Sequence, residues 1–348
     1  MGRWRCSASI DRRSADKSVF FPEKPGNLVL TPDANLVALK ALVARGSSNG
    51  AHIWPQLGHA GALSHAPISQ AKGPSPLNLE GLQCEGMTLA YIGRLPEAYA
   101  QAAVLAKEAG FGGVQIHAGH GFLFSQFLSP LFNHRTDGYG GTVSARFRVI
   151  EEVIDAVRSA VGTGYPIGVK INFTDKLVGG LSQDDALEAV RLIDRTSVDL
   201  VDVSGGTYFP GAPSSSDSAS TSGPYFIEFA RCAKNITSIP VMLTCGIKKR
   251  IEAIAALESG AADAIGLART MALNPSLANS WMSFDGCGPD FPKFDGTVPG
   301  GVTAWYSMRL TALGEDTEDQ FDQSLEEALE SYDARDAERC SRWLKRIS

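Results

Sequence analysis

Two histidines have a spacing and a setting that suit an active site. His117 and His120 lie three residues apart where the apolar run 114–116 stops, so they are predicted at the C-terminal end of a β-strand. Gly119 and Gly121 flank the second histidine and allow a tight turn there. In an α/β barrel the C-terminal ends of the strands hold the active site. We therefore interpret the pair as catalytic, with two histidines in an ordinary surface loop as the alternative.

The two imidazoles suit the binding of an oxygen atom that gains negative charge during a reaction. Each ring can donate an N–H hydrogen bond, and one such donor typically stabilises a transition state by about 2.7–4 kcal/mol. A zinc site is the rival interpretation, but it requires a third ligand. The motif places no carboxylate or cysteine where it could serve, so we predict no metal.

A second group of residues has the features of a phosphate site. Gly246 ends one predicted strand and Arg269 ends the next, and a short helix is expected near residue 274. In barrels the loops after the last two strands, with the N-terminus of a short helix, bind phosphate through backbone N–H groups. Arg269 would add charge-assisted hydrogen bonds. Glycines near strand ends are common for structural reasons alone, so the prediction depends on Arg269 and on the order of the elements.

The elements that must position these residues alternate between strand and helix. Repeated βα units with nearly continuous apolar strands demand a parallel sheet covered by helices. The predicted fold class is therefore α/β, a TIM (β/α)8-type barrel, although six strands are recognisable and a closed barrel needs eight. The six predicted strands are 52–57, 114–116, 167–172, 200–206, 241–246 and 264–269.

Three segments are expected along the chain. Residues 1–30 show no clear period and are expected to be irregular, and residues 31–280 are expected to form the barrel. Within the barrel, the serine-rich tract 213–223 is interpreted as a mobile active-site loop. Residues 281–348 are expected to form a helical tail. Its charged second half is interpreted as a solvated helix packed on the barrel, with a partner-binding arm as the alternative.

Composition and charge exclude several classes of protein. The chain has 348 residues, 44% of them hydrophobic, and its net charge of −6 argues against a nucleic-acid partner. The six cysteines form no Cys-x-x-Cys pair, so neither an iron–sulfur cluster nor a disulfide framework is expected. The sequence has no apolar run of the kind a signal peptide or a membrane span needs. We predict a cytoplasmic protein without a membrane partner.

The stretch IHAGHGFLFSQFLSPLFNHRTDGYGG resembles the old yellow enzyme family of FMN-dependent NAD(P)H oxidoreductases. The segment QLGHAG at 56–61 and the later CGI and GLAR segments add to a likeness that covers residues 8–280. Members of that family are (β/α)8 barrels that hold FMN at the C-terminal face. The resemblance therefore implies FMN as the cofactor and NADH or NADPH as the reductant.

The resemblance also implies roles for single residues. Gln56 would hydrogen-bond the flavin pyrimidine ring, and Lys170 would lie near its N1 and O2 atoms. His117 and His120 would bind the carbonyl or phenolate oxygen of a small-molecule substrate. The residues that would hold the FMN phosphate are Gly246, Ala268 and Arg269.

Three features depart from the family pattern. Where the family has a tyrosine that donates a proton to the substrate, this chain has Phe122, which cannot donate one. Tyr208 or Tyr225 is then the alternative donor. Ala62 stands where an arginine is common. The segment 7–13 resembles the stretch just after the second barrel strand, so strands one and two of the barrel are expected to be missing.

The sequence thus predicts an FMN-dependent enzyme that reduces the C=C bond of an enone or a similar carbonyl-activated alkene. One alternative is a redox-neutral, flavin-assisted isomerase, which needs no external proton donor. Another is a truncated, flavin-free and inactive homologue. An open sheet of six strands would leave unpaired edges at 52–57 and 264–269. We therefore expect weak FMN retention, relieved by a homodimer across those edges or by about 70 further residues upstream, the length of two βα units.

Overall fold

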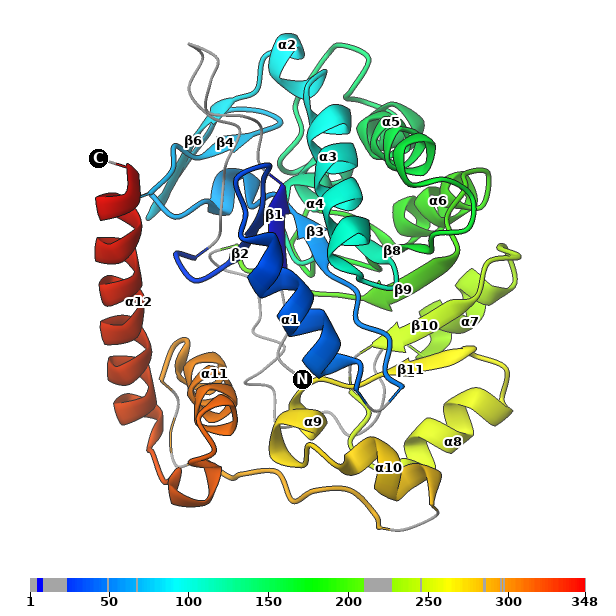
Figure 1. Cartoon of the computed structure of the whole chain (residues 1–348). Helices are drawn as coiled ribbons and strands as arrows, with labels where there is room; N and C mark the ends of the chain where they lie inside the picture. The colour runs from blue at the N-terminus through cyan, green and yellow to red at the C-terminus, as the bar shows by residue number, and fades with distance from the viewer. Residues whose placement is uncertain are drawn as a thin grey trace.

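The fold is built on one parallel sheet (Figure 1). The computed structural model describes residues 5–8, 24–48, 50–66, 68–209, 227–244, 246–283, 286–294, 296 and 298–347. Among them the sheet has eight strands, in the order β11-β10-β9-β8-β7-β3-β1-β2. The strands are β1 (Arg5–Ala8), β2 (Leu28–Leu30), β3 (Gln56–Gly58), β7 (Val114–Ala118), β8 (Ile167–Asn172), β9 (Leu200–Ser204), β10 (Val241–Thr244) and β11 (Ala264–Gly266).

Two of these strands correct the sequence analysis. β1 and β2 lie within residues 1–30, for which irregular structure was expected. β1 pairs with β2 on one side and with β3 on the other, so the strand expected to be an open edge at 52–57 has a neighbour. Both strands are three or four residues long, too short to show a period in the sequence. β11 pairs with β10, and no ladder joins it to another strand in the described part of the chain.

Helices cover the sheet and bury their apolar faces against it. In α5 (Val143–Val161) the buried positions include Phe147, Ile150, Ile154 and Val157, which recur every three or four residues. α5 packs on α3 (Leu95–Ala109), and α6 (Gln183–Ile193) packs on α5. The hydroxyl of Ser182 accepts a hydrogen bond from the Asp185 N–H at 3.1 Å, so Ser182 is the N-cap of α6. The other covering helices are α1 (Leu36–Gly46), α7 (Ile227–Lys234) and α8 (Arg250–Glu258).

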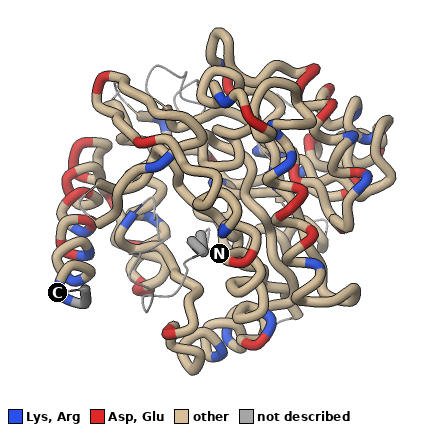
Figure 2. Tube along the Cα trace, turned by 90° about the horizontal axis from the view of Figure 1, so that it is seen from above, with Lys and Arg blue, Asp and Glu red and all other residues tan. Residues whose placement is uncertain are grey.

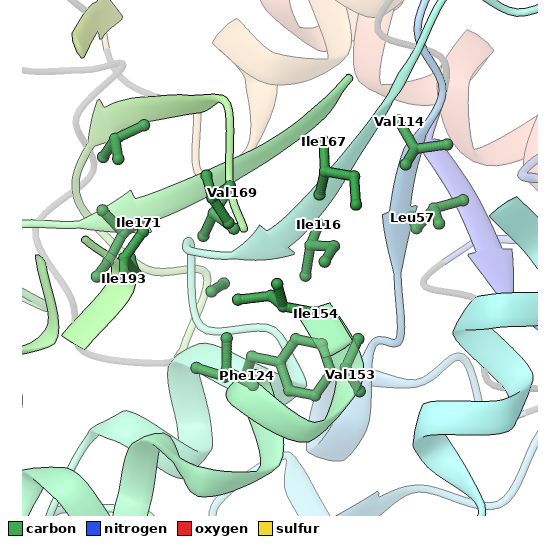
Figure 3. Packing of buried hydrophobic residues seen from close by; sticks show 14 of the residues in the cluster. Leu57, Val114, Ile116, Phe124, Val153, Ile154, Ile167, Val169, Ile171 and Ile193 are labelled. Atoms are coloured by element: carbon green, nitrogen blue, oxygen red, sulfur yellow. The ribbon is translucent and has the colours of Figure 1, made fainter. Parts of the chain in front are cut away.

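The core lies between the sheet and these helices. Ile167, Val169 and Ile171 of β8 alternate along the strand, and all three are fully buried. Figure 3 shows them on the same side as Ile116 of β7, with Ile154 and Phe124 packed beneath. Since the strands are buried on both faces, alternate residues of β8 must face the other side of the sheet, where the site lies.

Shorter elements lie along the chain between β3 and α3. A second, three-stranded sheet is formed by β4 (Lys72–Gly73), β5 (Leu77–Leu79) and β6 (Leu82–Gly86). Arg135, in the loop that follows α4 (Leu123–Leu128), donates hydrogen bonds to the Pro74 and Met87 carbonyls at 2.8 and 2.7 Å. This arginine therefore ties the long loop after the histidines to the second sheet. The remaining short elements here are η1 (Gly61–Leu63) and α2 (Leu89–Ile92).

The C-terminal part of the chain is helical. Its helices are α9 (Arg269–Leu273), α10 (Leu277–Met282), α11 (Gly301–Gly314), η2 (Glu318–Gln320) and α12 (Leu325–Ile347). α12 packs on α11, and Asp336 of α12 forms an ion pair with Lys24 at 3.4 Å. Figure 2 shows acidic and basic residues interspersed along α12. In the described ranges, no helix combines the length and the apolar character that crossing a membrane requires.

Candidate active site

The inward face of the sheet carries a connected group of polar side chains. Gln56 of β3 donates to the Gln115 side chain of β7 at 2.6 Å, and Gln115 donates to Asp202 of β9 at 3.0 Å. Lys170 of β8 donates to the same carboxylate oxygen at 2.6 Å. Thr244 of β10 donates to the other oxygen at 2.6 Å. Five neighbouring strands therefore each contribute one side chain to a continuous hydrogen-bonded layer, which we call the polar layer.

Two glycines make room for the polar layer. Gln115 lies opposite Gly168 in the strand register, and its side chain crosses β8 to reach Asp202 on the far side. A Cβ at Gly168 would lie 3.6 Å from Gln115 Cγ, so any larger side chain would compete with this crossing. A Cβ at Gly266 would lie 2.0 Å from the hydroxyl of Thr244. A glycine is therefore required beside the hydroxyl that reaches Asp202.

The histidine pair lies directly beside the polar layer. His117 is opposite Lys170 in the register of β7 and β8. The rings of His117 and His120 are 5.1 Å apart and nearly perpendicular, and the residues are 3% and 7% exposed. The Gly119 N–H points at Nδ1 of His117, 3.3 Å away. In the neutral ring Nδ1 is then the acceptor, and the ring N–H is on Nε2.

Backbone and side-chain contacts fix the position of His120. Its φ of +60° lies in the left-handed region, which costs a non-glycine residue roughly 1–2 kcal/mol. Its N–H donates to the Asn172 side-chain oxygen at 3.0 Å, and Asn172 donates in turn to the Gly206 carbonyl at 2.7 Å. Its Nε2 is 3.2 Å from the hydroxyl of Ser204. The end of β8 and the loop after β9 thus hold the strained turn in place.

Phe122 lies against the histidine pair, and a tyrosine lies beside it. The Phe122 ring is 5.0 Å from the His117 ring and 5.8 Å from the ring of Tyr208. Tyr208 is also 6.1 Å from the His120 ring, and 46% of its surface is exposed. Of the two alternative proton donors, Tyr208 therefore borders the histidines. Tyr225 and the serine-rich tract 213–223 lie outside the described residues.

His59, in the segment QLGHAG, has a structural setting. It accepts a hydrogen bond from the Gly61 N–H at 2.9 Å through Nδ1, and its Nε2 is 3.1 Å from the hydroxyl of Tyr91. Burial lowers the pKa of His59 to about 3, because the charged ring would lose its water. Ala62, at the position where an arginine is common, is buried, and its N–H donates to Gln126 at 3.1 Å. These contacts order the turn after β3.

The residues predicted to bind phosphate lie three or more strands away from β7. Gly246 follows β10 with a φ of +84°, a conformation that favours glycine. The strand expected at 264–269 ends at Gly266, and Arg269 is the first residue of α9, with Ala268 as its N-cap. The Arg269 guanidinium lies 5.8 Å from the centre of the Tyr306 ring on α11. Burial raises the pKa of Tyr306 to about 12, and the positive charge of Arg269 opposes that rise.

Sequence reasoning missed most of the polar layer. Gln56 and Lys170 were predicted as site residues. Gln115, Asp202 and Thr244 were not, although each is a polar residue inside an otherwise apolar strand. That pattern was the available signal, because a polar side chain in a doubly buried strand needs a hydrogen-bonding partner. Among the described residues no cluster of histidine, cysteine or carboxylate side chains could hold a metal ion.

A parallel sheet covered by helices, with polar side chains at the C-terminal ends of its strands, is the arrangement of α/β barrel enzymes. A solved structure of an old yellow enzyme homologue from Zymomonas mobilis matches this fold with a TM-score of 0.65 and 22% identity, covering 85% of this chain and 83% of that one. This match confirms the predicted TIM-type α/β fold. The chain belongs to the NADH:flavin oxidoreductase / NADH oxidase family, whose model matches residues 14–282.

Curated relatives agree with this family. NADPH dehydrogenase of Geobacillus thermodenitrificans is 36% identical over 251 residues, which cover 72% of this chain and 71% of the relative. NADH-dependent flavin oxidoreductase iliE of Neonectria sp. is 31% identical over 312 residues, covering 80% of this chain and 40% of the relative. The chain therefore spans less than half the length of the Neonectria protein.

Proposed function

We propose that this chain is an FMN-dependent NAD(P)H oxidoreductase that reduces the C=C bond of an enone or a similar carbonyl-activated alkene. The observation that carries the proposal is the register of β7 and β8, in which His117 lies opposite Lys170. This pairing brings a buried pair of imidazoles and a buried ammonium group to the same end of the sheet. The first suits a substrate oxygen, and the second suits a flavin.

The residues present fit FMN. Gln56 and Lys170 offer amide and ammonium donors for the oxygens of the pyrimidine ring. Gly246, Ala268 and Arg269 offer a glycine turn, a helix start and a guanidinium for the phosphate. When bound, FMN supplies hydride chemistry, with NADH or NADPH as the reductant.

The histidines have the role of stabilising charge on the substrate oxygen. Both rings are almost completely buried, so their hydrogen bonds act with little competition from water. Asn172 and Ser204 hold His120, so this donor needs little reorganisation when the oxygen becomes negative. We infer that His117 donates through Nε2, because its Nδ1 accepts from the Gly119 N–H. An oxygen held between the two rings fixes the orientation of the alkene.

A flavin-assisted isomerase is the second candidate, and Phe122 is the observation that favours it. An isomerase returns a proton to the substrate and needs no external donor. Phe122 stands at the position of the expected donor, and it is buried against His117. Oxidation of NADPH that depends on an added enone supports the reductase. Conversion of the substrate without NADPH consumption supports the isomerase.

The experiment on the histidines uses phenol as a probe. In FMN-loaded protein we expect a simple phenol to give a long-wavelength absorbance band with the flavin. His117→Ala and His120→Ala should each abolish the band and lower the rate of enone reduction by about 10²–10³-fold. The exposed His134, in the loop that follows α4, supplies a matched control, because His134→Ala should leave the band intact. If the band persists in both site variants, the substrate oxygen is bound by residues other than His117 and His120.

Domain boundaries, location and assembly stay predictions. We propose a barrel over residues 31–280 and a C-terminal helical segment over 281–348. We also propose a cytoplasmic protein that forms a homodimer, with β11 as a candidate edge because β10 is its described neighbour. Light scattering coupled to size exclusion would measure the mass in solution. A single monomeric species at micromolar concentration would contradict the dimer.

A further inference from the structure

The carboxylate of Asp202 is the centre of the polar layer. It accepts hydrogen bonds from Lys170, Gln115 and Thr244 at 2.6, 3.0 and 2.6 Å. The Lys170 and Asp202 side chains are 6% and 3% exposed, so the ion pair is almost completely removed from water. A buried carboxylate with three donors is well compensated, and a buried ammonium beside it is neutralised.

We propose that Asp202 cancels the charge of Lys170, so that Lys170 acts on bound flavin as a hydrogen-bond donor and not as a net positive charge. This inference rests on the proposed function and adds a positioning residue to it. Asp202 acts through Lys170 and Gln115, which in turn contacts Gln56.

The composition of the polar layer supports this role. Gln56, Gln115 and Thr244 are neutral, so Lys170 and Asp202 are its two charged members and their charges sum to zero. An ammonium group has three N–H donors, and Asp202 occupies one of them. Two donors are left for a ligand, with their direction set by the ion pair. The arrangement therefore offers a ligand hydrogen bonds in fixed directions, while the polar layer as a whole carries no net charge.

A neutral layer and a positive layer would act differently on a flavin. Reduced flavin carries more negative charge than oxidised flavin, so a net positive charge nearby favours the reduced form. Asp202→Asn keeps the shape of the side chain and removes its negative charge, so the positive charge of Lys170 is no longer compensated. We expect this variant to favour the reduced form at least tenfold more than the unmodified protein does. For a two-electron couple that is a rise in reduction potential of about 30 mV.

The test compares reduction potentials, measured against a reference dye, across a set of variants. Asp202→Asn should raise the potential, and Lys170→Met should lower it, because the carboxylate is then uncompensated. The double variant Asp202→Asn with Lys170→Met should return towards the unmodified value. If the two residues had a purely structural role, the single variants would not shift the reduction potential in opposite directions, and the shifts would not cancel in the double variant. Asp185→Asn is the matched control, because it removes a carboxylate from the half-buried ion pair with Arg146 on the helices, and it should not move the potential.

A second measurement needs no flavin. In the flavin-free chain, each single variant should unfold at a lower temperature, because each leaves one buried charge without its partner. The double variant should unfold at a temperature no lower than that of the less stable single variant. Additive losses of stability, or a potential that is unchanged or lowered in Asp202→Asn, would overturn the inference. Failure of the unmodified chain to bind FMN would instead overturn the proposed function, and the unfolding comparison would still decide whether the two charges are paired.

Discussion

The two faces of the central sheet are formed by the same strands, but one face is held by apolar packing and the other by hydrogen bonds. In β8 the residues Ile167, Val169 and Ile171 face the helices, and all three are fully buried among apolar neighbours (Figure 3). Lys170 lies between Val169 and Ile171, Asn172 follows Ile171, and both side chains form hydrogen bonds with defined partners. Dispersion contacts tolerate an exchange of one aliphatic side chain for another, whereas hydrogen bonds have a donor, an acceptor and a direction. One strand can therefore supply stability with one set of side chains and chemistry with the other.

Phe122 and Phe124, two residues apart at the start of α4, repeat this contrast. Phe122 contacts His117 and Tyr208 in the site. Phe124 is fully buried in the core, with its ring 5.0 Å from that of Tyr99 on α3. A substitution at one should change catalysis and a substitution at the other should change stability. The predictions for Phe122 and Phe124 test this separation.

The largest change is expected in the rate of flavin reoxidation by an enone, and it should follow from Phe122→Tyr. This change adds a proton donor on the site side, and a positioned general acid contributes about 10²–10⁴-fold to a rate. In flavin-loaded protein we expect faster reoxidation by an enone and an almost unchanged rate of flavin reduction by NADPH. Stopped-flow absorbance measures the two half-reactions separately. If reoxidation does not speed up, Tyr208 already donates the proton, and Tyr208→Phe should then slow it.

Phe124→Ala is expected to act on stability. Truncating a fully buried phenylalanine removes apolar contacts and leaves a cavity, which typically costs about 3–5 kcal/mol. The free energy of unfolding, measured by urea titration, should fall by that amount. The ratio of the two half-reaction rates should stay close to that of the unmodified protein at a temperature where the variant is folded. A small loss of stability with a large loss of activity would place Phe124 in the site and break the separation.

The smallest effect is expected from His59, whose pKa is lowered by burial to about 3. Between pH 6.5 and about 3 the unfolded chain binds a proton at this residue and the folded chain does not. Unfolding therefore takes up a proton, and this residue's contribution to stability falls by about 1.4 kcal/mol per pH unit as the pH drops below 6.5.

The measurement for His59 is a difference between two proteins. His59→Asn removes the titrating group and keeps an acceptor near the Gly61 N–H. At pH 7 the unmodified protein should be the more stable of the two, and the gap should narrow towards pH 5. All other titrating groups cancel in the difference. A gap that is constant between pH 7 and pH 5 would show that His59 is not held neutral in the folded protein.

The sequence predicted those parts of the fold that leave a long local pattern. The strand 167–172 was placed correctly, because an apolar run is a local signal. β1 and β2 were missed because a strand of three or four residues is defined by its partners in the sheet. The strand expected at 264–269 was too long, because the start of α9 at Arg269 depends on tertiary contacts such as that with Tyr306.

The candidate site divides in the same way. The histidine pair could be found because both residues belong to one motif. The connection of Gln115 to Asp202 spans 87 positions and crosses an intervening strand, so no window along the chain contains it. Knowledge of the strand order and register is needed before these polar residues can be recognised as one layer.

Gly168 gives the polar layer a form of modularity that a protein engineer could use. Two pairs of side chains are connected across this position, which has no side chain of its own. One is the amide pair of Gln56 and Gln115, and the other is the charged pair of Lys170 and Asp202. Filling this position with a branched side chain would separate the two halves without altering any member of either. Each half could then be redesigned on its own, whereas with glycine in place a change at Gln56 is transmitted to Lys170 through three hydrogen bonds.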